Sequence, residues 1–374
     1  MPEFVPGLEL CGAFYGEVVR PLLGRIAPGL PHSAALIGEG SEVLGLDTPM
    51  SADHGWGPRV MLFLAPEHLV THGDVIREEL RCSLPRTFRG YPTNFVAPDP
   101  AAGGNPAMQL ADSGPVNHRV DVRTLSDWLG DYLGFDARAV PSPTDWLTFP
   151  EQKLLGITRG AVYHDDLGLA ALRRRFAYYP EDVWLYLLAS GWARVAQEEH
   201  LMGRAGLVGD EIGSALIGAR LVRDIMRLCF LMERTYAPYP KWFGSGFARL
   251  GCGEVVGGSL RDAMRADGWQ ERERHLCAAY EQVARMHNEL HITEPIDCRA
   301  RPFHDRPFRV IGGGRFADPI LRRIADPEVR RLAERRRIGS IDQFSDSTDL
   351  TCAAELRPAL VSLYADPGKQ ARGA

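Results

Sequence analysis

The apolar residues of this chain change their spacing near residue 145, and this change constrains the fold more than any other feature of the sequence. Before it, short apolar runs at residues 33–38, 59–64 and 119–123 have the length and flanking residues of β-strands. After it, up to about residue 295, apolar residues recur every three or four positions, as on one face of a helix. We therefore expect an α+β chain, with a mixed β-sheet region followed by a helical bundle.

The length of the chain fits more than one domain, since 374 residues exceed the usual size of a single domain. We predict a mixed α/β domain over residues 1–140 and a helical bundle over residues 141–300. An Arg-rich extension over residues 301–374 is expected to pack on the helical domain and to end in a disordered tail.

Charge and composition exclude several classes of protein. The 43 basic and 48 acidic side chains leave a formal charge of -5, which argues against a polynucleotide partner. No apolar run approaches the ~20 residues that cross a bilayer, and the N-terminus carries no basic region, so we expect a cytoplasmic protein without membrane contact. Seven cysteines without a C-x-x-C pair indicate free thiols rather than a disulfide framework or a zinc ribbon.

The strongest chemical pattern follows the first two apolar runs. Gly40 and Ser41 come after the first run, and Asp53 precedes the second, which is the layout of a nucleotidyltransferase site. Small residues let backbone N–H groups and a hydroxyl approach a triphosphate, while carboxylates on adjacent strands hold Mg²⁺. Asp121 alternates with Val120 and Val122 on a further strand, so it is the candidate for a shared metal ligand or a base.

Cationic residues are the second part of this prediction. Arg59 ends the pattern and is placed either on a phosphate or on a nearby carboxylate. Arg227 lies on a charged stripe of the helix predicted over residues 211–234, where it reaches either phosphates or acidic partners across the bundle. Lys241 follows that helix beside Trp242 and is a candidate for the γ-phosphate, with a salt bridge as the alternative.

Several motifs spread over nearly the whole chain resemble the DUF4037 family, a mostly bacterial group assigned to the nucleotidyltransferase superfamily. They include residues 38–45, 53–59, 149–153, 163–165, 223–227, 239–243, 287–288 and 339–343. The resemblance implies a cupped mixed sheet that carries the site and a helical domain that closes over the nucleotide.

One position departs from the pattern of the resemblance. Superfamily sites carry two carboxylates one residue apart, and relatives often read Asp-His-Asp, whereas this chain has Gly55 at the second position. Either the site has lost a metal ligand and is degenerate or repurposed, or Asp53 and Asp121 still hold one ion, helped by His54, Asp47 or Glu42. If residues 53 and 55 share a strand, their side chains lie on one face, so an aspartate at position 55 would restore the pair.

Other candidate sites have a structural alternative that we favour. His287 and His291 are spaced for metal chelation on a helix, but we favour a helix end packed on the bundle, because the glutamate of an H-E-x-x-H motif is out of place here. Gly312 to Gly314 are expected to form a turn, because a G-x-G-x-x-G spacing is missing. Glu198 to His200 are expected to form a partly exposed helix face, and Asp342, Asp346 and Asp349 are expected to cap loops.

The function expected from these residues is transfer of a nucleoside monophosphate from Mg-NTP to a small acceptor with a hydroxyl or amine. Asp53 would ligate Mg²⁺, and Asp121 would share the ion or accept the proton of the acceptor. Gly40 and Ser41 would bind the β- and γ-phosphates, with Arg59, Lys241 or Arg227 balancing their charge. The alternative is a catalytically degenerate or repurposed nucleotide-binding protein.

Overall fold

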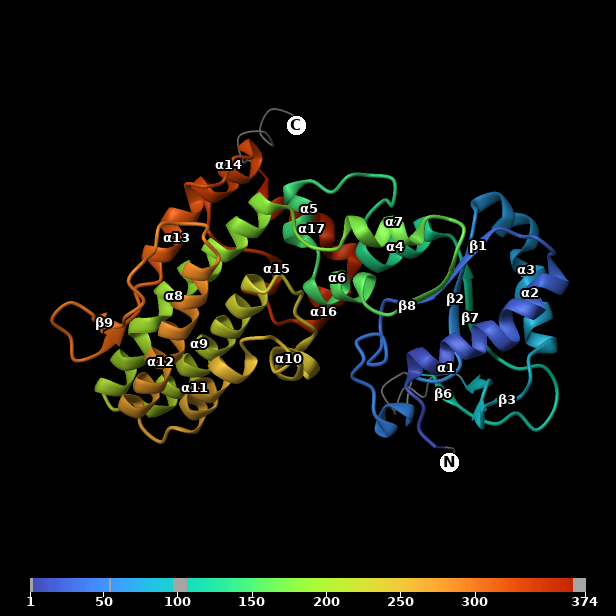
Figure 1. Cartoon of the computed structure of the whole chain (residues 1–374), viewed down its shortest axis with the longest axis horizontal. Coiled ribbons are helices and arrows are strands. Elements are labelled where there is room, and N and C mark those ends of the chain that lie inside the picture. Colours follow the sequence, from blue (N-terminus) through green and yellow to red (C-terminus); the bar gives the residue numbers. More distant parts are fainter. Residues whose placement is uncertain (1–2, 54, 97–105, 366–374) are drawn as a thin grey trace. The chain divides into compact units, whose positions relative to one another are not determined.

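The computed structural model of the chain describes residues 3–53, 55–96 and 106–365. It confirms a mixed α+β chain with a small mixed sheet and many helices (Figure 1). The chain divides into two compact units. The sheet unit comprises residues 1–140 and 153–177, and the helical unit comprises residues 141–152 and 178–374. In the described part of the chain, no helix is both long and apolar enough to cross a membrane.

The sheet unit is built on four strands in the order β7-β2-β1-β8. These strands are β1 (His32–Leu36), β2 (Arg59–Leu64), β7 (Arg119–Arg123) and β8 (Ala161–Asp165). β1 lies antiparallel to β2 and to β8, whereas β7 runs parallel to β2. Two short hairpins join β3 (Thr87–Phe88) to β4 (Tyr91–Pro92) and β5 (Phe95–Val96) to β6 (Ala107–Met108).

Helices cover one face of this sheet, and the apolar side chains between the helices and the sheet form the core of the unit (Figure 1). They are α1 (Gly7–Phe14), a π-helical turn (Tyr15–Val19), α2 (Arg20–Ile26) and α3 (Pro66–Ser83). Strand side chains alternate between the two faces, so Val120 and Val122 of β7 enter this core while Asp121 points to the opposite, open face. α4 (Leu125–Leu133) covers part of that face through Trp128, whose ring lies 5.8 Å from the ring of Phe63.

Strand β8 lies in the stretch that the helical spacing assigned to the bundle. Its side chains are half-buried or exposed, so its sequence carries little of the apolar signal of a strand. Pairing with β1 brings it into the sheet, together with α7 (Leu169–Arg175) and most of α6 (Glu151–Thr158).

The helical unit contains four long helices that pack on one another: α8 (Glu181–Leu207), α9 (Glu211–Met232), α11 (Gly253–Arg265) and α12 (Trp269–Glu289) (Figure 1). The spacing of apolar residues predicts α8, α9 and α12, and not α11. Of the predicted helices, α9 and α12 bury mainly one face, whereas α8 is buried on all sides from Val183 to Trp192. Shorter elements complete the unit: α5 (Pro143–Thr148), α10 (Pro240–Phe247), the hairpin of β9 (Arg301–Pro302) and β10 (Arg309–Val310), α13 (Gly314–Leu321), α14 (Pro327–Arg335), α15 (Ile341–Phe344), α16 (Thr348–Cys352) and α17 (Arg357–Tyr364). The tail expected to be disordered lies, after residue 365, outside the described residues.

The glycine run at residues 312–314 is a turn held by a buried carboxylate. Glu199 of α8 accepts hydrogen bonds from the N–H groups of Ile311, Gly312 and Gly313 at 2.6, 3.0 and 3.1 Å. Burial raises the pKa of Glu199, and these three donors act in the opposite direction. The turn is confirmed, but the expectation that Glu199 lies on a partly exposed helix face is wrong, because only 5 % of this residue is accessible.

Replacing Glu199 should therefore destabilise the helical unit. Glu199→Ala leaves three N–H groups without their acceptor, and we expect the free energy of unfolding to fall by about 3 kcal/mol. Glu199→Gln keeps one acceptor oxygen, so its free energy of unfolding should fall by less. Chemical denaturation measures both, with Glu334→Ala on the exposed side of α14 as a control within about 0.5 kcal/mol of the parent. Equal stability of Glu199→Ala and the parent protein would contradict this role.

Candidate functional site

A cavity of about 520 Å³ lies on the face of the sheet opposite α1 to α3, beside α4, at the end where β1 stops and β2 and β7 begin. Antiparallel pairing places the end of β1 beside the start of β2, and parallel pairing places the start of β7 next to it. The lining residues include Gly38, Glu39, Arg59, Met61, Arg119, Asp121, Arg123, Trp128, Asp131 and Tyr132. The cavity thus gathers residues from the places where the sequence predicts the site.

Asp121 is the predicted site residue with the most open position in this cavity. Its side chain is 53 % exposed, and its backbone pairs with Met61 of β2. The Nη1 atom of Arg123 lies 3.9 Å from Oδ2 of Asp121, while Nη2 of the same guanidinium forms an ion pair with Asp131. Asp121 therefore presents a carboxylate to the cavity beside a cation.

Arg119 and Arg123 are cavity residues that the sequence prediction missed. Arg119 is partly buried, which lowers the pKa of its guanidinium, and its Nη1 donates to the carbonyl of Gly55 at 3.1 Å. The signal that identifies both residues is alternation: they stand two positions before and after Asp121, so they share its face of the strand.

Arg59 forms the ion pair that was one of its two predicted roles. Its Nε donates to Oε1 of buried Glu42 at 2.9 Å, and its Nη2 also bonds Glu42 and donates to the carbonyl of Glu39 at 2.7 Å. Gly40 lies against this pair with a φ of +132°, and a Cβ there would lie 2.5 Å from Nη2 of Arg59. The ion pair therefore explains the glycine at position 40.

Ser41 follows in the same turn, and its carbonyl accepts a hydrogen bond from Leu46 N–H at 2.9 Å. Of the described residues of this turn, Gly38 and Glu39 line the cavity, and Gly40 and Ser41 do not. The phosphate-binding role of Gly40 and Ser41 stays a prediction.

The second half of the predicted motif lies before strand β2 rather than in it. Asp53 is the last residue of a short 3₁₀ helix (Pro49–Asp53), and β2 begins only at Arg59. The side chain of Asp53 and all of His54 lie outside the described residues. Gly55 has a φ of +68°, and its N–H donates to the carbonyl of Pro106 at 2.8 Å. The expectation that residues 53 and 55 alternate on one strand face is therefore wrong.

Arg227 lines a different cavity, of about 340 Å³, within the helical unit. Its Nη1 lies 3.8 Å from Oε1 of Glu151, and its guanidinium lies 5.3 Å from the centre of the Phe243 ring. Its Nε and Nη1 are buried without a hydrogen-bond partner. A buried guanidinium with unused donors is able to receive an anionic group.

The neighbours of Arg227 on helix α9 pair with carboxylates of the bundle. Arg220 bonds Glu198 at 2.8 Å, Asp224 accepts from Arg194 at 3.2 Å, and Arg223 forms an ion pair with Asp346. Lys241 is exposed, with its ammonium 5.0 Å from the centre of the Trp242 ring. Arg220 and Arg223, on the same charged stripe of the helix as Arg227, therefore have acidic partners within the helical unit.

Two buried carboxyl groups lie next to Arg227. Oδ2 of Asp342 accepts the N–H of Glu151 at 2.9 Å, although these residues are 191 positions apart, and Oε2 of Glu151 accepts the N–H of Ala237 at 2.8 Å. Burial raises the pKa of Glu151 to about 7; Asp342 acts in the same direction, while Arg227 and Arg223 oppose it. Burial also raises the pKa of Asp342. Asp342 is therefore a core residue rather than a surface loop cap.

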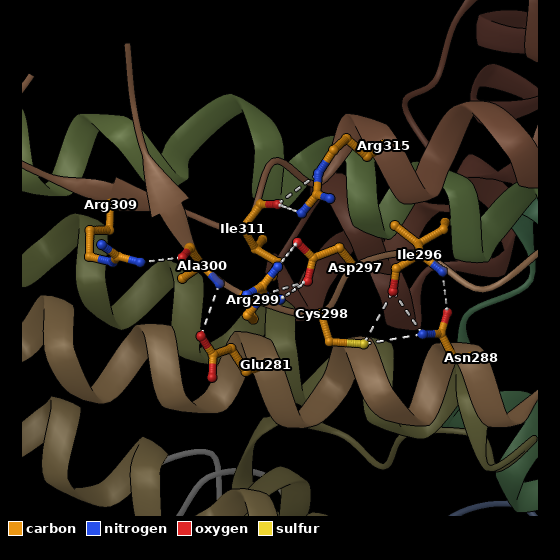
Figure 2. Close-up of polar contacts among 10 residues, drawn as sticks. All are labelled: Glu281, Asn288, Ile296, Asp297, Cys298, Arg299, Ala300, Arg309, Ile311 and Arg315. Atoms are coloured by element: carbon orange, nitrogen blue, oxygen red, sulfur yellow. Dashed lines mark hydrogen bonds and ion pairs between the residues drawn. The ribbon is translucent and has the colours of Figure 1, made fainter. Parts of the chain in front are cut away.

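His287 and His291 do not form a chelating pair on one helix. His287 is fully buried in α12, where burial lowers its pKa to about 4 and Nε2 lies 3.1 Å from Oγ1 of Thr293. His291 follows the end of the helix with a φ of +53°. Figure 2 shows the adjacent Asn288, which forms two hydrogen bonds with the backbone of Ile296. Its Nδ2 donates to the carbonyl of Ile296 at 2.8 Å, and its Oδ1 accepts the N–H of Ile296 at 3.0 Å. This confirms the alternative of a packed helix end.

In a comparison with protein families, residues 146–243 match the family model described as a domain of unknown function, DUF4037. The match supports the predicted resemblance. The matched segment runs from α5 to α10 and contains Arg227 and Lys241, but it lies outside the part of the chain that holds Asp53, Arg59 and Asp121. No curated protein and no solved structure matches the chain.

The backbone at Gly55 should limit substitution there. Gly55→Ala places a Cβ in a left-handed conformation, so we expect a loss of about 1 kcal/mol in the free energy of unfolding. Gly24→Ala is the matched control, because Gly24 is exposed in α2, has no atom within 4 Å of its Cβ position, and should be neutral or stabilising. Equal effects of the two substitutions in thermal and chemical denaturation would contradict this conformation.

Glu151 should make stability depend on pH. Because its pKa is raised from 4.5 to about 7, the folded protein keeps a proton that the unfolded chain has lost between these values. This contribution is fully present below about pH 4.5 and is lost as the pH rises through 7. Glu151→Gln, which keeps an acceptor for Ala237, should therefore gain stability relative to the parent between pH 5 and pH 8.

Unfolding free energies at pH 5, 6, 7 and 8 test this expectation, with exposed Glu254→Gln as the control. A difference between Glu151→Gln and the parent protein that stays constant over this range would show that Glu151 titrates normally.

Proposed function

We propose that this protein is a nucleotidyltransferase that binds a nucleoside triphosphate in the cavity of the sheet unit. It transfers the nucleoside monophosphate to a small acceptor with a hydroxyl or amine and releases pyrophosphate. The observation that supports this proposal is the open sheet face on which Asp121 stands between Arg119 and Arg123 beside the turn that follows β1. Its cavity of about 520 Å³ is of the size that small-molecule ligands occupy.

In this proposal, the guanidinium groups of the cavity bind the phosphate groups of the nucleotide. Planar guanidinium groups donate paired hydrogen bonds to phosphate oxygens, and partial burial strengthens these bonds by lowering the local dielectric constant. Arg119 and Arg123 carry this role, because the partner of Arg123, Asp131, is exposed, whereas Arg59 is bonded to buried Glu42 and shapes the turn. In the helical unit, Arg227 and Lys241 remain candidates for a phosphate group, and the unused donors of Arg227 favour it of the two.

Asp121 is the candidate for the acid–base step. A carboxylate that faces the cavity is able to accept the proton of an attacking hydroxyl or amine, provided that the acceptor lies within hydrogen-bond reach. Its exposure leaves its oxygens accessible to a ligand, and Arg123 holds it by an ion pair of 3.9 Å.

The residues of this cavity fit Mg²⁺. This ion prefers oxygen ligands and is usually held by one or two carboxylates together with phosphate oxygens of the substrate. Asp121 supplies such a carboxylate, and the resemblance implies Asp53 as the second. When bound, Mg²⁺ neutralises negative charge on the phosphate groups and supports transfer.

A second candidate function is nucleotide binding without transfer. Position 55 offers no carboxylate, and its carbonyl instead accepts a hydrogen bond from Arg119. The guanidinium groups that line the cavity still bind phosphate groups when a metal carboxylate is missing, so this arrangement suits binding without catalysis.

The test of the proposed transfer is Asp121→Asn, assayed with each of the four nucleoside triphosphates and a panel of small alcohols, sugars and amines. Pyrophosphate release should fall about 100-fold or more. Binding measured by calorimetry without Mg²⁺ should not weaken, since the substitution removes a negative charge from beside Arg119 and Arg123. The melting temperature should stay near that of the parent protein, because Asp121 is exposed.

The control is Asp74→Asn on α3, whose side chain is fully exposed and lies outside the lining of the cavity. Binding by the parent protein without release of pyrophosphate would favour the second candidate. No binding of any triphosphate, or release unchanged in Asp121→Asn, would refute the proposal.

A further inference from the structure

A cluster of two histidines and an aspartate lies at the other end of strand β1, in the sheet unit. His32 begins β1, His164 lies in β8, and Asp166 follows β8. One possible ligand atom of each residue lies within 4.8 Å of those of the other two. In the described part of the chain, no other group of three histidine, cysteine or carboxylate side chains meets this condition.

Strand pairing fixes the three residues relative to one another. The N–H of Asp166 donates to the carbonyl of His32 at 3.1 Å, and His164 pairs with Ala34, two residues after His32. His32 and His164 are therefore diagonal neighbours on one face, and their ring centres lie 4.4 Å apart. A register irregularity between Ala34 and Ala35 interrupts this strand pair, as β-bulges do where side chains are redirected.

The hydrogen bonds of His32 leave one of its ring nitrogens with a lone pair. Nδ1 lies 2.9 Å from the carbonyl oxygen of Leu30, which only accepts, so Nδ1 carries the proton. Nε2 then accepts from the hydroxyl of Tyr15 at 2.8 Å. Donation of the other ring N–H to a backbone carbonyl is the arrangement that orients histidine ligands in metal sites.

We infer that His32, His164 and Asp166 bind a divalent transition-metal ion such as Zn²⁺, with a coordination position left open. Two imidazoles and one carboxylate are a ligand set that Zn²⁺ accepts when three protein groups hold it. Tetrahedral coordination needs ligand atoms about 3.3 Å apart, as follows from Zn–N bonds of about 2.0 Å.

Binding of the ion requires the ligand atoms to move closer together. We expect His164 and Asp166 to make this adjustment, because their side chains are 28 % and 45 % exposed, whereas His32 is buried. The hydrogen bond of 2.7 Å between His164 Nε2 and Asp166 Oδ2 would be replaced by bonds of both atoms to the metal ion. If Nε2 of His32 is the ligand atom, the hydroxyl of Tyr15 gives up its present bond to it. Tyr15 begins the π-helical turn of the first helix, a feature found often at functional sites.

Calorimetric titration of the full-length protein with Zn²⁺, without a histidine tag and after treatment with a chelator, tests this site. We expect one ion per chain and a higher melting temperature with Zn²⁺. His164→Ala and Asp166→Ala should each weaken binding by at least 10-fold and lose the visible absorption of bound Co²⁺. Both side chains are partly exposed, so these variants should fold.

His72→Ala is the matched control. His68 and His72 lie four residues apart on α3, a spacing that can also bind Zn²⁺, so this variant tests whether the ion binds there instead. It should bind Zn²⁺ like the parent protein, and so should Asp121→Asn, which separates this site from the proposed nucleotide site. The inference is overturned if the parent protein does not bind Zn²⁺, or if His72→Ala loses binding while His164→Ala keeps it.

Discussion

The pairing of strand β1 on both of its edges is the constraint on which the sheet unit depends. β2 binds one edge and β8 the other, both antiparallel, so the register of one five-residue strand decides what meets at each end of the sheet. At its C-terminal end, the turn from Gly38 comes beside the first residues of β2 and β7. At its N-terminal end, His32 comes beside Asp166. A slip of one residue would reverse the faces and separate both groups.

Charge is arranged differently at the two ends of this sheet. At the cavity, the guanidinium groups of Arg59, Arg119 and Arg123 from β2 and β7 lie around the carboxylate of Asp121, and these donors suit the phosphate groups of an anionic ligand. At the other end, imidazole nitrogens and a carboxylate lie together, which suits a cation. The two proposals therefore concern ligands of opposite charge and fail independently of each other.

The helical unit uses buried charges to join segments that are far apart in sequence. Glu199 holds the turn at residues 311–313, and Asp342 holds the N-terminus of α6 through Glu151. Each buried carboxylate accepts backbone N–H bonds that offset part of its cost of burial, and the raised pKa of Glu151 shows that the offset is incomplete. Arg227 beside Glu151 has donors left over, so this is the place in the helical unit where an anion would gain most.

The sequence by itself determined the strands β1, β2 and β7, the long helices α8, α9 and α12, and the open-face position of Asp121. These features follow from local periodicity, since burial of one face leaves its mark on neighbouring residues. The tertiary structure alone decided that β8 joins the sheet, that Glu42 occupies Arg59, and that Gly55 stands in a left-handed turn before the strand. It alone brings His32 to His164 across 132 positions of sequence. Strand partners, counter-charges and clustered ligands depend on which distant segments meet, and no local pattern of side chains encodes that choice.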